Sequence, residues 1–380
     1  DRLRSRGLGD VYKRQVWINN SAVPSSEADA RTFSFDIIPS SQLDNMLVVK
    51  SPAPEYPADF SGGFILVNTK DVPSSNLFTI SVGTSLNDQT HFKKFLYNKG
   101  SGTDFLGFDN GFRSLKGGIN AVLSPMNNGY DLLNNGLNND WTVIDRRPLA
   151  DLSLNMNFSR RWVDSSGRTL AILGTVNYSN SYRTYLDMDN NLFGAYDMTH
   201  DCSNYLRKSI DDQYNHSVRI GTMLNFTYIP ASGNSRYEFK NIFNQLGKDR
   251  YTYRKGTDAQ SDYEESAEYY YQSRTTYNGQ FTGKHILGNT DKLDWSAGYS
   301  YANRNMPDRR RYTTVLNEET NQLEVENLNE INREFSRLDE HILSANINYQ
   351  HDFSFGIFTP SLKVGAYTCL LYTSPSPRDR

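Results

Sequence analysis

The stretch that decides the fold is Leu152-Ser153-Leu154-Asn155-Met156-Asn157-Phe158-Ser159. Its apolar side chains alternate strictly with small polar ones. This is the pattern of a β-strand with one face against apolar material and the other against water. The alternation returns along the chain and predicts nine strands, at 77–86, 151–162, 169–182, 215–229, 235–247, 267–284, 292–305, 334–351 and 353–368.

The connections between these strands alternate in length. Long ones are predicted at 87–150, 183–214, 248–266 and 306–333, and short ones at 163–168, 230–234, 285–291 and 352. A soluble sandwich has no reason to place every long loop at one end. Outer-membrane barrels do, because their periplasmic turns are short and their extracellular loops are long. The spacing therefore predicts a mostly β fold in which about nine strands belong to a transmembrane antiparallel β-barrel.

The composition agrees with a barrel. Only 37% of the 380 residues are hydrophobic, whereas 13% are aromatic and Tyr outnumbers Phe by 25 to 20. A barrel needs apolar side chains only on its outer band, with aromatic residues at the two interfaces. Tyr178, Tyr182, Tyr228, Tyr299 and Tyr301 are candidates for interface positions, although each one taken singly fits an exposed strand residue better. The net charge of -3 argues against a nucleic-acid partner.

Residues 16–73 have a different character. Ile37–Lys50 predicts a short helix followed by a strand, Ser51–Pro57 has three prolines and predicts a loop, and Gly62-Gly63 precedes an apolar strand at Phe64–Lys70. The residues that carry this motif are Pro39, Val49, Lys50, Pro52, Tyr56, Gly62, Gly63, Asn68, Thr69 and Lys70.

In order and spacing, this motif resembles the C-terminal half of the α/β plug domain of TonB-dependent outer-membrane receptors. The wording Pro57-Ala58-Asp59-Phe60 resembles Bacteroidota-type members. The resemblance implies a plug segment at 16–73 and the N-terminal part of the barrel at 74–368, where the family's whole barrel has about 22 strands. The motif residues would then have a structural and gating role.

The resemblance also implies a function. It is the energised uptake, in the outer membrane of a Gram-negative bacterium, of a scarce nutrient such as a siderophore, cobalamin, an oligosaccharide or a peptide. The implied partners are the TonB–ExbB–ExbD complex, reached through an N-terminal part that precedes these residues, and outer-membrane lipid and lipopolysaccharide. A glycan-importing member would add a SusD-like lipoprotein. The alternatives are a passive porin-like barrel and a soluble, β-rich glycan-binding or adhesin module.

The two ends differ from the rest. Residues 1–15 and 369–380 resemble translated sequencing-adapter sequence, and we expect both to be non-native. Cys202 and Cys369 are expected to be unpaired thiols, because two cysteines define neither a disulfide framework nor a zinc site.

No constellation for catalysis stands out. The six histidines are scattered and no serine or cysteine lies in a nucleophile motif, so we expect no enzyme, cofactor or metal site. Arg309–Arg311 is read as a solvated loop, or as a contact for lipopolysaccharide phosphates. An acidic cluster of Asp262, Glu264, Glu265 and Glu268 is read as surface, or as a cation site. The Asn-rich connection 87–150, which contains Trp141, is read as a loop folded over the barrel mouth, or as a glycan contact.

Overall fold

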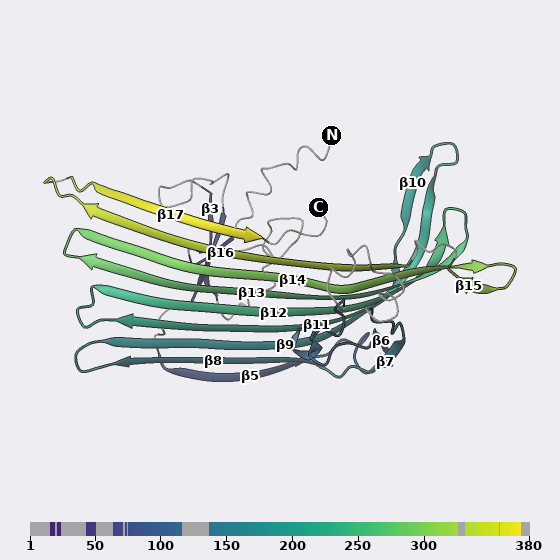
Figure 1. Cartoon of the computed structure of the whole chain (residues 1–380), viewed down its shortest axis with the longest axis horizontal. Helices are drawn as coiled ribbons and strands as arrows, with labels where there is room; N and C mark the ends of the chain where they lie inside the picture. Colours follow the sequence, from purple (N-terminus) through teal and green to yellow (C-terminus); the bar gives the residue numbers. More distant parts are fainter. Residues whose placement is uncertain are drawn as a thin grey trace, which may run out of the picture.

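The computed structural model describes residues 16–19, 21–23, 43–50, 64–70, 73, 75–115, 137–325, 331–356 and 358–373, and every structural statement below refers to these residues. Most of them belong to two sheets (Figure 1). The smaller sheet has the order β2-β1-β4-β3. Its strands are β1 (Val16–Ile18), β2 (Ser21–Ala22), β3 (Leu43–Val49) and β4 (Phe64–Thr69).

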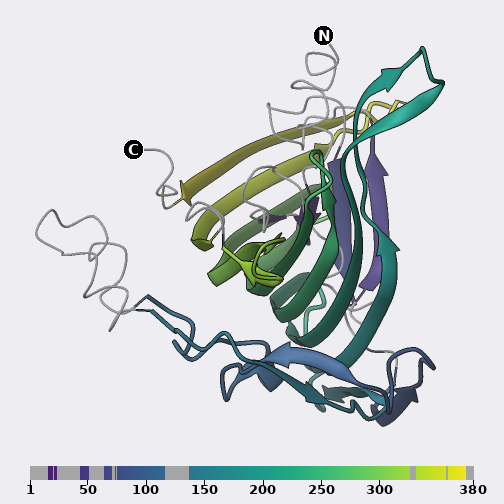
Figure 2. The same cartoon turned by 90° about the vertical axis from the view of Figure 1, so that its right-hand side faces the viewer.

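The larger sheet is an antiparallel meander in the order β17-β16-β14-β13-β12-β11-β9-β8-β5, and it is curved across its strands (Figure 2). The bounds are β5 (Leu77–Ser85), β8 (Asp151–Val163), β9 (Thr169–Asp189), β11 (Cys202–Ile229), β12 (Ser235–Asp258), β13 (Tyr263–Leu287), β14 (Asp291–Asn317), β16 (Asn332–Asp352) and β17 (Ser361–Thr373). Two short strands, β10 (Leu192–Asp197) and β15 (Gln322–Glu324), add to β11 and β14. The predicted fold class, mostly β with a large antiparallel sheet, is confirmed.

The predicted short turns are also present. They lie between β8 and β9, β11 and β12, and β13 and β14. Each contains the glycine expected from the sequence in the left-handed region, with φ of 84° at Gly167, 72° at Gly233 and 81° at Gly288. Glycine reaches that region without a steric penalty.

Three of the four predicted long loops were wrong. Most of 183–214, 248–266 and 306–333 is strand, and only a four-residue turn, 259–262, separates β12 from β13. Backbone pairing continues in register past the last aliphatic residues, for example from Met223↔Ile242 to Asp211↔Arg254. The apolar alternation ends there, but the hydrogen-bond ladder does not. The last turn was also misplaced, because β17 begins at Ser361 and not at 353.

The start of β3 and the end of β17 bear on two other predictions. The predicted helix before β3 lies mostly outside the described residues, and Leu43–Asn45 is already strand. β17 continues to Thr373 and pairs with β16 as far as Glu340↔Thr373, so the strand extends five residues into the segment that we expected to be non-native. The foreign origin of that segment stays a prediction.

The two faces of the large sheet carry different side chains. One face, which we call the apolar face, holds Leu152, Leu154, Met156 and Phe158, and all four are more than a third exposed. The opposite face, the polar face, is covered in part by the small sheet. There Ile18 and Val67 pack against Met223 of β11 and Ile242 of β12, which are nearly fully buried. Side chains alternate between the two faces along a regular strand. These contacts therefore show on which face each side chain of such a strand lies.

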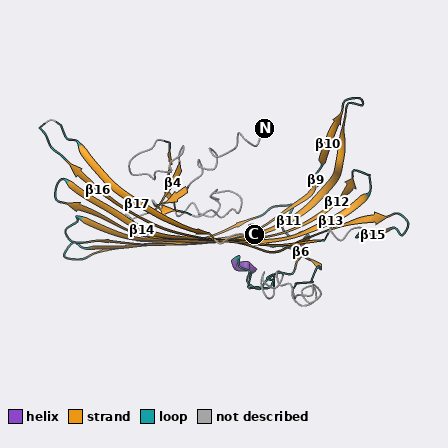
Figure 3. Cartoon of the chain, turned by 45° about the horizontal axis from the view of Figure 1, so that its top comes forward, coloured by secondary structure: helices purple, strands orange, loops and turns teal. Residues whose placement is uncertain are grey.

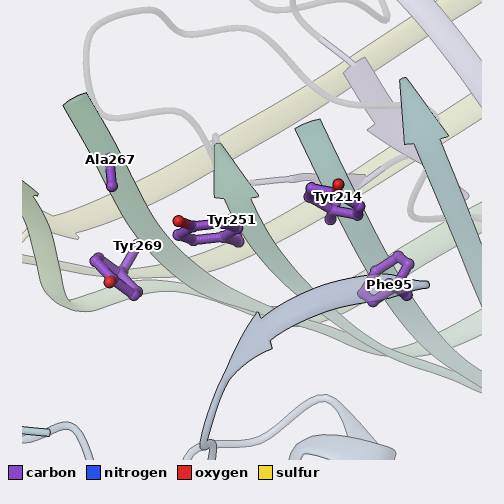
Figure 4. Close-up of a cluster of buried hydrophobic side chains, with 5 residues drawn as sticks. All are labelled: Phe95, Tyr214, Tyr251, Ala267 and Tyr269. Carbon is purple, nitrogen blue, oxygen red and sulfur yellow. The ribbon is translucent and has the colours of Figure 1, made fainter. Parts of the chain in front are cut away.

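The first long connection packs on the apolar face through its described parts, 86–115 and 137–150, at the end of the strands away from the short turns. It contains β6 (Phe95–Asn98), a 3₁₀ turn η3 (Asp104–Leu106) and β7 (Val143–Arg146). Figure 3 shows β4 on one side of the large sheet and β6 with the helical turn on the other. Phe95 packs with Tyr214, Tyr251, Ala267 and Tyr269 (Figure 4). We call the described parts of this connection the covering layer.

Candidate functional site

The polar face carries a pocket beyond the small sheet, where β11 to β14 continue past the apolar band. Its volume is about 680 Å³. Its charged lining is Asp211 from β11, Arg250 and Arg254 from β12, Glu268 from β13, and Arg309 and Arg311 from β14. We call this group the arginine pocket.

Strand register brings these side chains together from distant parts of the sequence. Asp211 pairs with Arg254, and Glu268 pairs with Arg311. Directly paired residues project to the same side of a sheet. A register shift after Met306 resets the alternation of β14, so that Arg309 and Arg311 face the pocket while Arg310 faces the covering layer.

Ion pairs hold three of the four arginines in place. Arg254 donates two hydrogen bonds to the Asp211 carboxylate, from Nε to Oδ1 at 2.7 Å and from Nη2 to Oδ2 at 2.9 Å. Burial by itself raises the pKa of Asp211, but hydrogen bonds from Arg254 and Asn190 outweigh it and leave the pKa lowered. Such forked pairs are stronger than single contacts. Asp211 is therefore an ionised anchor for Arg254.

Glu268 forms a second anchor. It accepts a hydrogen bond from Arg250 Nη2 at 2.6 Å and another from Arg309 Nε at 2.8 Å. Burial raises the pKa of Glu268, whereas the charges of Arg250 and Arg309 lower it by more. Both guanidinium groups also lie over the Tyr270 ring, 4.7 Å and 5.6 Å from its centroid. The two arginines are thus fixed in position and turned toward one another.

Positive charge exceeds negative charge in the pocket. Four arginines and two carboxylates line it, a difference of +2. Arg207, Glu264 and Glu334 at its rim reduce this to +1, five arginines against four carboxylates. Arg311 is exposed and forms no ion pair in the part of the chain that the structure describes. Its five N–H donors can therefore meet a carboxylate or phosphate from outside.

Neutral hydrogen-bonding groups complete the lining, among them Asn190, Gln213 and Thr252. Within the described ranges no group of three His, Cys, Asp or Glu side chains is placed to hold a metal ion. No described helix is long and apolar enough to cross a membrane. The arrangement suits binding of an anionic, oxygen-rich solute.

Sequence reasoning found only part of this site. Arg309–Arg311 was wrongly placed in a loop, because it lies within β14 and its side chains divide between the two faces. The predicted acidic cluster does not form a single group of side chains, because Glu264 and Glu268 lie on one face of β13 and Glu265 lies on the other. Asp211, Arg250 and Arg254 were missed. The signal available for the last two was the spacing Arg250-x-Thr252-x-Arg254, which keeps the alternation of β12.

The covering layer is fastened by polar contacts rather than left open to solvent. Arg310 donates to the Asp140 carbonyl at 2.6 Å and to Asn98 Oδ1 at 2.7 Å. Its guanidinium also lies 5.0 Å from the Trp141 ring and 4.9 Å from the Tyr269 ring. Because Trp141 is packed in this way, its faces are not an open platform for a sugar.

Five of the predicted plug-motif residues lie in the described ranges, namely Val49, Lys50, Asn68, Thr69 and Lys70. Thr69 is buried, and its N–H donates to Asn19 Oδ1 at 2.9 Å. The Lys70 carbonyl accepts a hydrogen bond from Asn225 of β11 at 2.9 Å. The motif end is thus tied both within the small sheet and to the large one. Pro39, Pro52, Tyr56, Gly62 and Gly63 fall outside the described residues.

Comparison with known proteins gives a limited result. No family model and no curated protein matches the chain. Solved structures that resemble it include the ferric citrate transporter FecA in the unliganded form (10% identity, 96% of this chain and 50% of that one, TM-score 0.26). Two more are from Acinetobacter baumannii: the ferric preacinetobactin receptor BauA (11%, 96% and 51%, TM-score 0.27) and the siderophore receptor PiuA (8%, 94% and 54%, TM-score 0.23).

The chain therefore spans about half the length of these three proteins. With identities and TM-scores this low, the likeness does not assign a family.

Proposed function

We propose that this chain is part of a TonB-dependent outer-membrane receptor that imports an anionic nutrient. The observation that carries the proposal is the contrast between the two faces of the large sheet. One face is apolar and uncovered along its middle, whereas the other is polar and partly filled by the small sheet. A soluble sandwich would bury the apolar row under a second layer.

The dimensions of the apolar face support a membrane setting. On β11 the part of this face that is not buried runs from Tyr228 to Ile220, eight residues along the strand, or about 19 Å across a bilayer at a tilt of 45°, and Val218 beyond it is buried. Aromatic residues bound the apolar face. Trp162, Tyr228, Tyr237, Trp295 and Tyr349 lie near the short turns, and Tyr178, Tyr277, Tyr299 and Tyr301 lie at the other end. Tyr182, by contrast, packs against Phe95 and His216 and belongs to the covering layer's contacts.

The small sheet favours an energised receptor over a passive porin. It packs on Met223 and Ile242, and Ser21 and Ala22 hydrogen-bond to Ser344 and Ser300 of β16 and β14. A segment seated on the polar face would obstruct free diffusion through a closed barrel. TonB-dependent pulling on such a plug, through the TonB–ExbB–ExbD complex, is the mechanism that we propose for opening the path.

The arginine pocket supports an anionic nutrient rather than a neutral sugar. It lies on the same face as the small sheet, beyond it on the side away from the short turns. Carboxylate, catecholate or phosphate oxygens would meet Arg311 and the fixed guanidinium groups of Arg254 and Arg309. The nutrient would be bound and moved without cleavage of any bond.

The test is growth of iron-limited cells that carry the whole receptor. We expect an anionic ferric tricarboxylate or tricatecholate to support growth, and a neutral ferric hydroxamate not to, with growth lost when TonB is deleted. The double variant Arg309→Gln/Arg311→Gln should lower uptake at least tenfold. Arg168→Gln, an exposed arginine in a short turn at the opposite end, is the matched control and should change nothing. TonB-independent uptake would favour a porin.

A further inference from the structure

The covering layer has an exposed apolar surface directly beside the apolar band. The hydroxyl of Tyr178, at the upper edge of the band, donates to the Phe105 carbonyl at 3.0 Å. Gln245 lies in the same cross-strand row, because it and Tyr178 both pair with Ile220 of β11, and it donates to the Gly107 carbonyl at 2.5 Å. These two bonds place η3 at the level where the aliphatic side chains end.

Apolar side chains project from this layer into the surroundings. Phe92 is 59% exposed, Phe105 is 56% and Leu149 is 72%. The other exposed apolar members are Leu86, Leu106, Phe108, Phe112 and Ile144. Single exposed apolar residues are normal, whereas a group of them marks an interaction surface. Here the group continues an apolar band that the structure leaves uncovered.

The charges of the layer match a lipid headgroup surface. Lys93, Lys94 and Lys99 are exposed and form no ion pair among the described residues. Asp104 and Asp109 share a single basic partner, Arg113. The described parts of the layer, 86–115 and 137–150, carry six Lys and Arg side chains and five Asp side chains, a net charge of +1, whereas an outer leaflet that carries phosphate groups is negative. Aromatic rings with neighbouring lysines are typical of interfacial anchors.

We infer that the covering layer is an interfacial anchor, which lies in the headgroup region of the outer leaflet with Phe105, Phe108 and Phe92 among the lipid chains. Its occupant is the lipid surface. The inference rests on the proposed outer-membrane placement of the sheet. The layer would hold the long strands at a fixed depth, in addition to its packing on the aromatic side chains of β11 to β13.

The test measures the depth of spin labels in vesicles of phosphatidylcholine with a minority of phosphatidylglycerol. The receptor carries Cys202→Ser and Cys369→Ser, because both thiols of this chain are exposed. Single cysteines then replace Phe105, Gly102 or Leu154. Gly102 lies in the same segment with no atom within 4 Å of an added Cβ, and serves as the water reference. Leu154 on the apolar face serves as the lipid reference.

The measured quantity is the ratio of the label's collision rate with oxygen to its collision rate with a water-soluble nickel complex. We expect this ratio to be severalfold higher for the label at position 105 than for the label at 102. Lys93→Glu with Lys94→Glu should reduce that ratio in the anionic vesicles and leave it unchanged in pure phosphatidylcholine. Equal ratios at 105 and 102, with a lipid-exposed label at 154, would overturn the anchor alone. A water-exposed label at 154 would overturn the outer-membrane placement itself.

Discussion

Replacing Gly247 with alanine should release the covering layer from the sheet. A Cβ at this position would lie 2.5 Å from Gly107 Cα and 3.1 Å from its carbonyl carbon. The obstacle is backbone, so η3 has to move away and the Gln245 to Gly107 hydrogen bond is lost. Overpacking costs about 1–3 kcal/mol and the hydrogen bond about 0.5–1.5 kcal/mol. Together they raise the open population roughly 10- to 1,000-fold.

Cleavage after Arg113 reports the opening. The Arg113 side chain is buried and bonded to Asp104 and Asp109, so the site is protected while the layer is docked. An arginine-specific protease is added to intact cells that carry the whole receptor, and the initial rate of cleavage after Arg113 is followed by mass spectrometry. When opening is fast, this rate follows the open population.

Gly102→Ala is the matched control, because it lies in the same segment and its added Cβ meets nothing within 4 Å. It should leave the cleavage rate unchanged. If Gly247→Ala and Gly102→Ala are cleaved after Arg113 at the same rate, the close approach of Gly107 to Gly247 does not hold the layer in place.

Three further predictions concern the sheet and its contacts. Expressed alone, this chain should aggregate or be degraded in membranes. The free edges of β5 and β17 leave about twenty N–H and C=O groups without partners, and each such group costs several kcal/mol in lipid. A monomeric, heat-resistant species in detergent would contradict this. Ile242→Ala should weaken the attachment of the small sheet by about 2–5 kcal/mol, because Ile242 is 2% exposed against Ile18 and Val67; hydrogen exchange in 64–70 should accelerate, while Leu224→Ala on the apolar face should have little effect there. Burial raises the pKa of Asp249, which lies beyond the apolar band, to about 6 from 3.8. Protonated Asp249 therefore favours the docked layer over the open one. This contribution to the stability of the docked layer is complete below about pH 4 and is lost as the pH rises through 6. Cleavage after Arg113 should therefore be slower at about pH 5 than at about pH 8, and Asp249→Asn should remove the difference.

The nine main strands could be predicted because their middle parts need opposite surroundings on the two faces. Leu154 and Met156 alternate with Ser153, Asn155 and Asn157 only because one row is left uncovered and the other meets a polar interior. Past the band this contrast disappears from the sequence. Tyr251 and Arg250 both read as loop residues, although one packs under Phe95 and the other lines the pocket.

The arginine pocket and the covering layer could not be found from the sequence for a related reason. Asp211 and Arg254 are 43 positions apart, and only the register of β11 against β12 places them together. The contact of Gly107 with Gly247 joins two segments that are 140 positions apart. Neither glycine is in a recognisable motif. Such contacts depend on how far each strand continues, which is the feature that the alternation fails to report.

Both faces of the sheet change character past the apolar band, and the change follows their surroundings. On β12 the apolar face changes from Phe239 and Phe243 to Gln245, Gly247 and Tyr251, while the polar face changes from Ile242 under the small sheet to Arg250 and Arg254. The backbone ladder is uninterrupted through this change. A fold boundary would interrupt the pairing. A change of solvent, from lipid to water on one side and from plug to open vestibule on the other, would alter the side chains and leave the strands continuous, as observed.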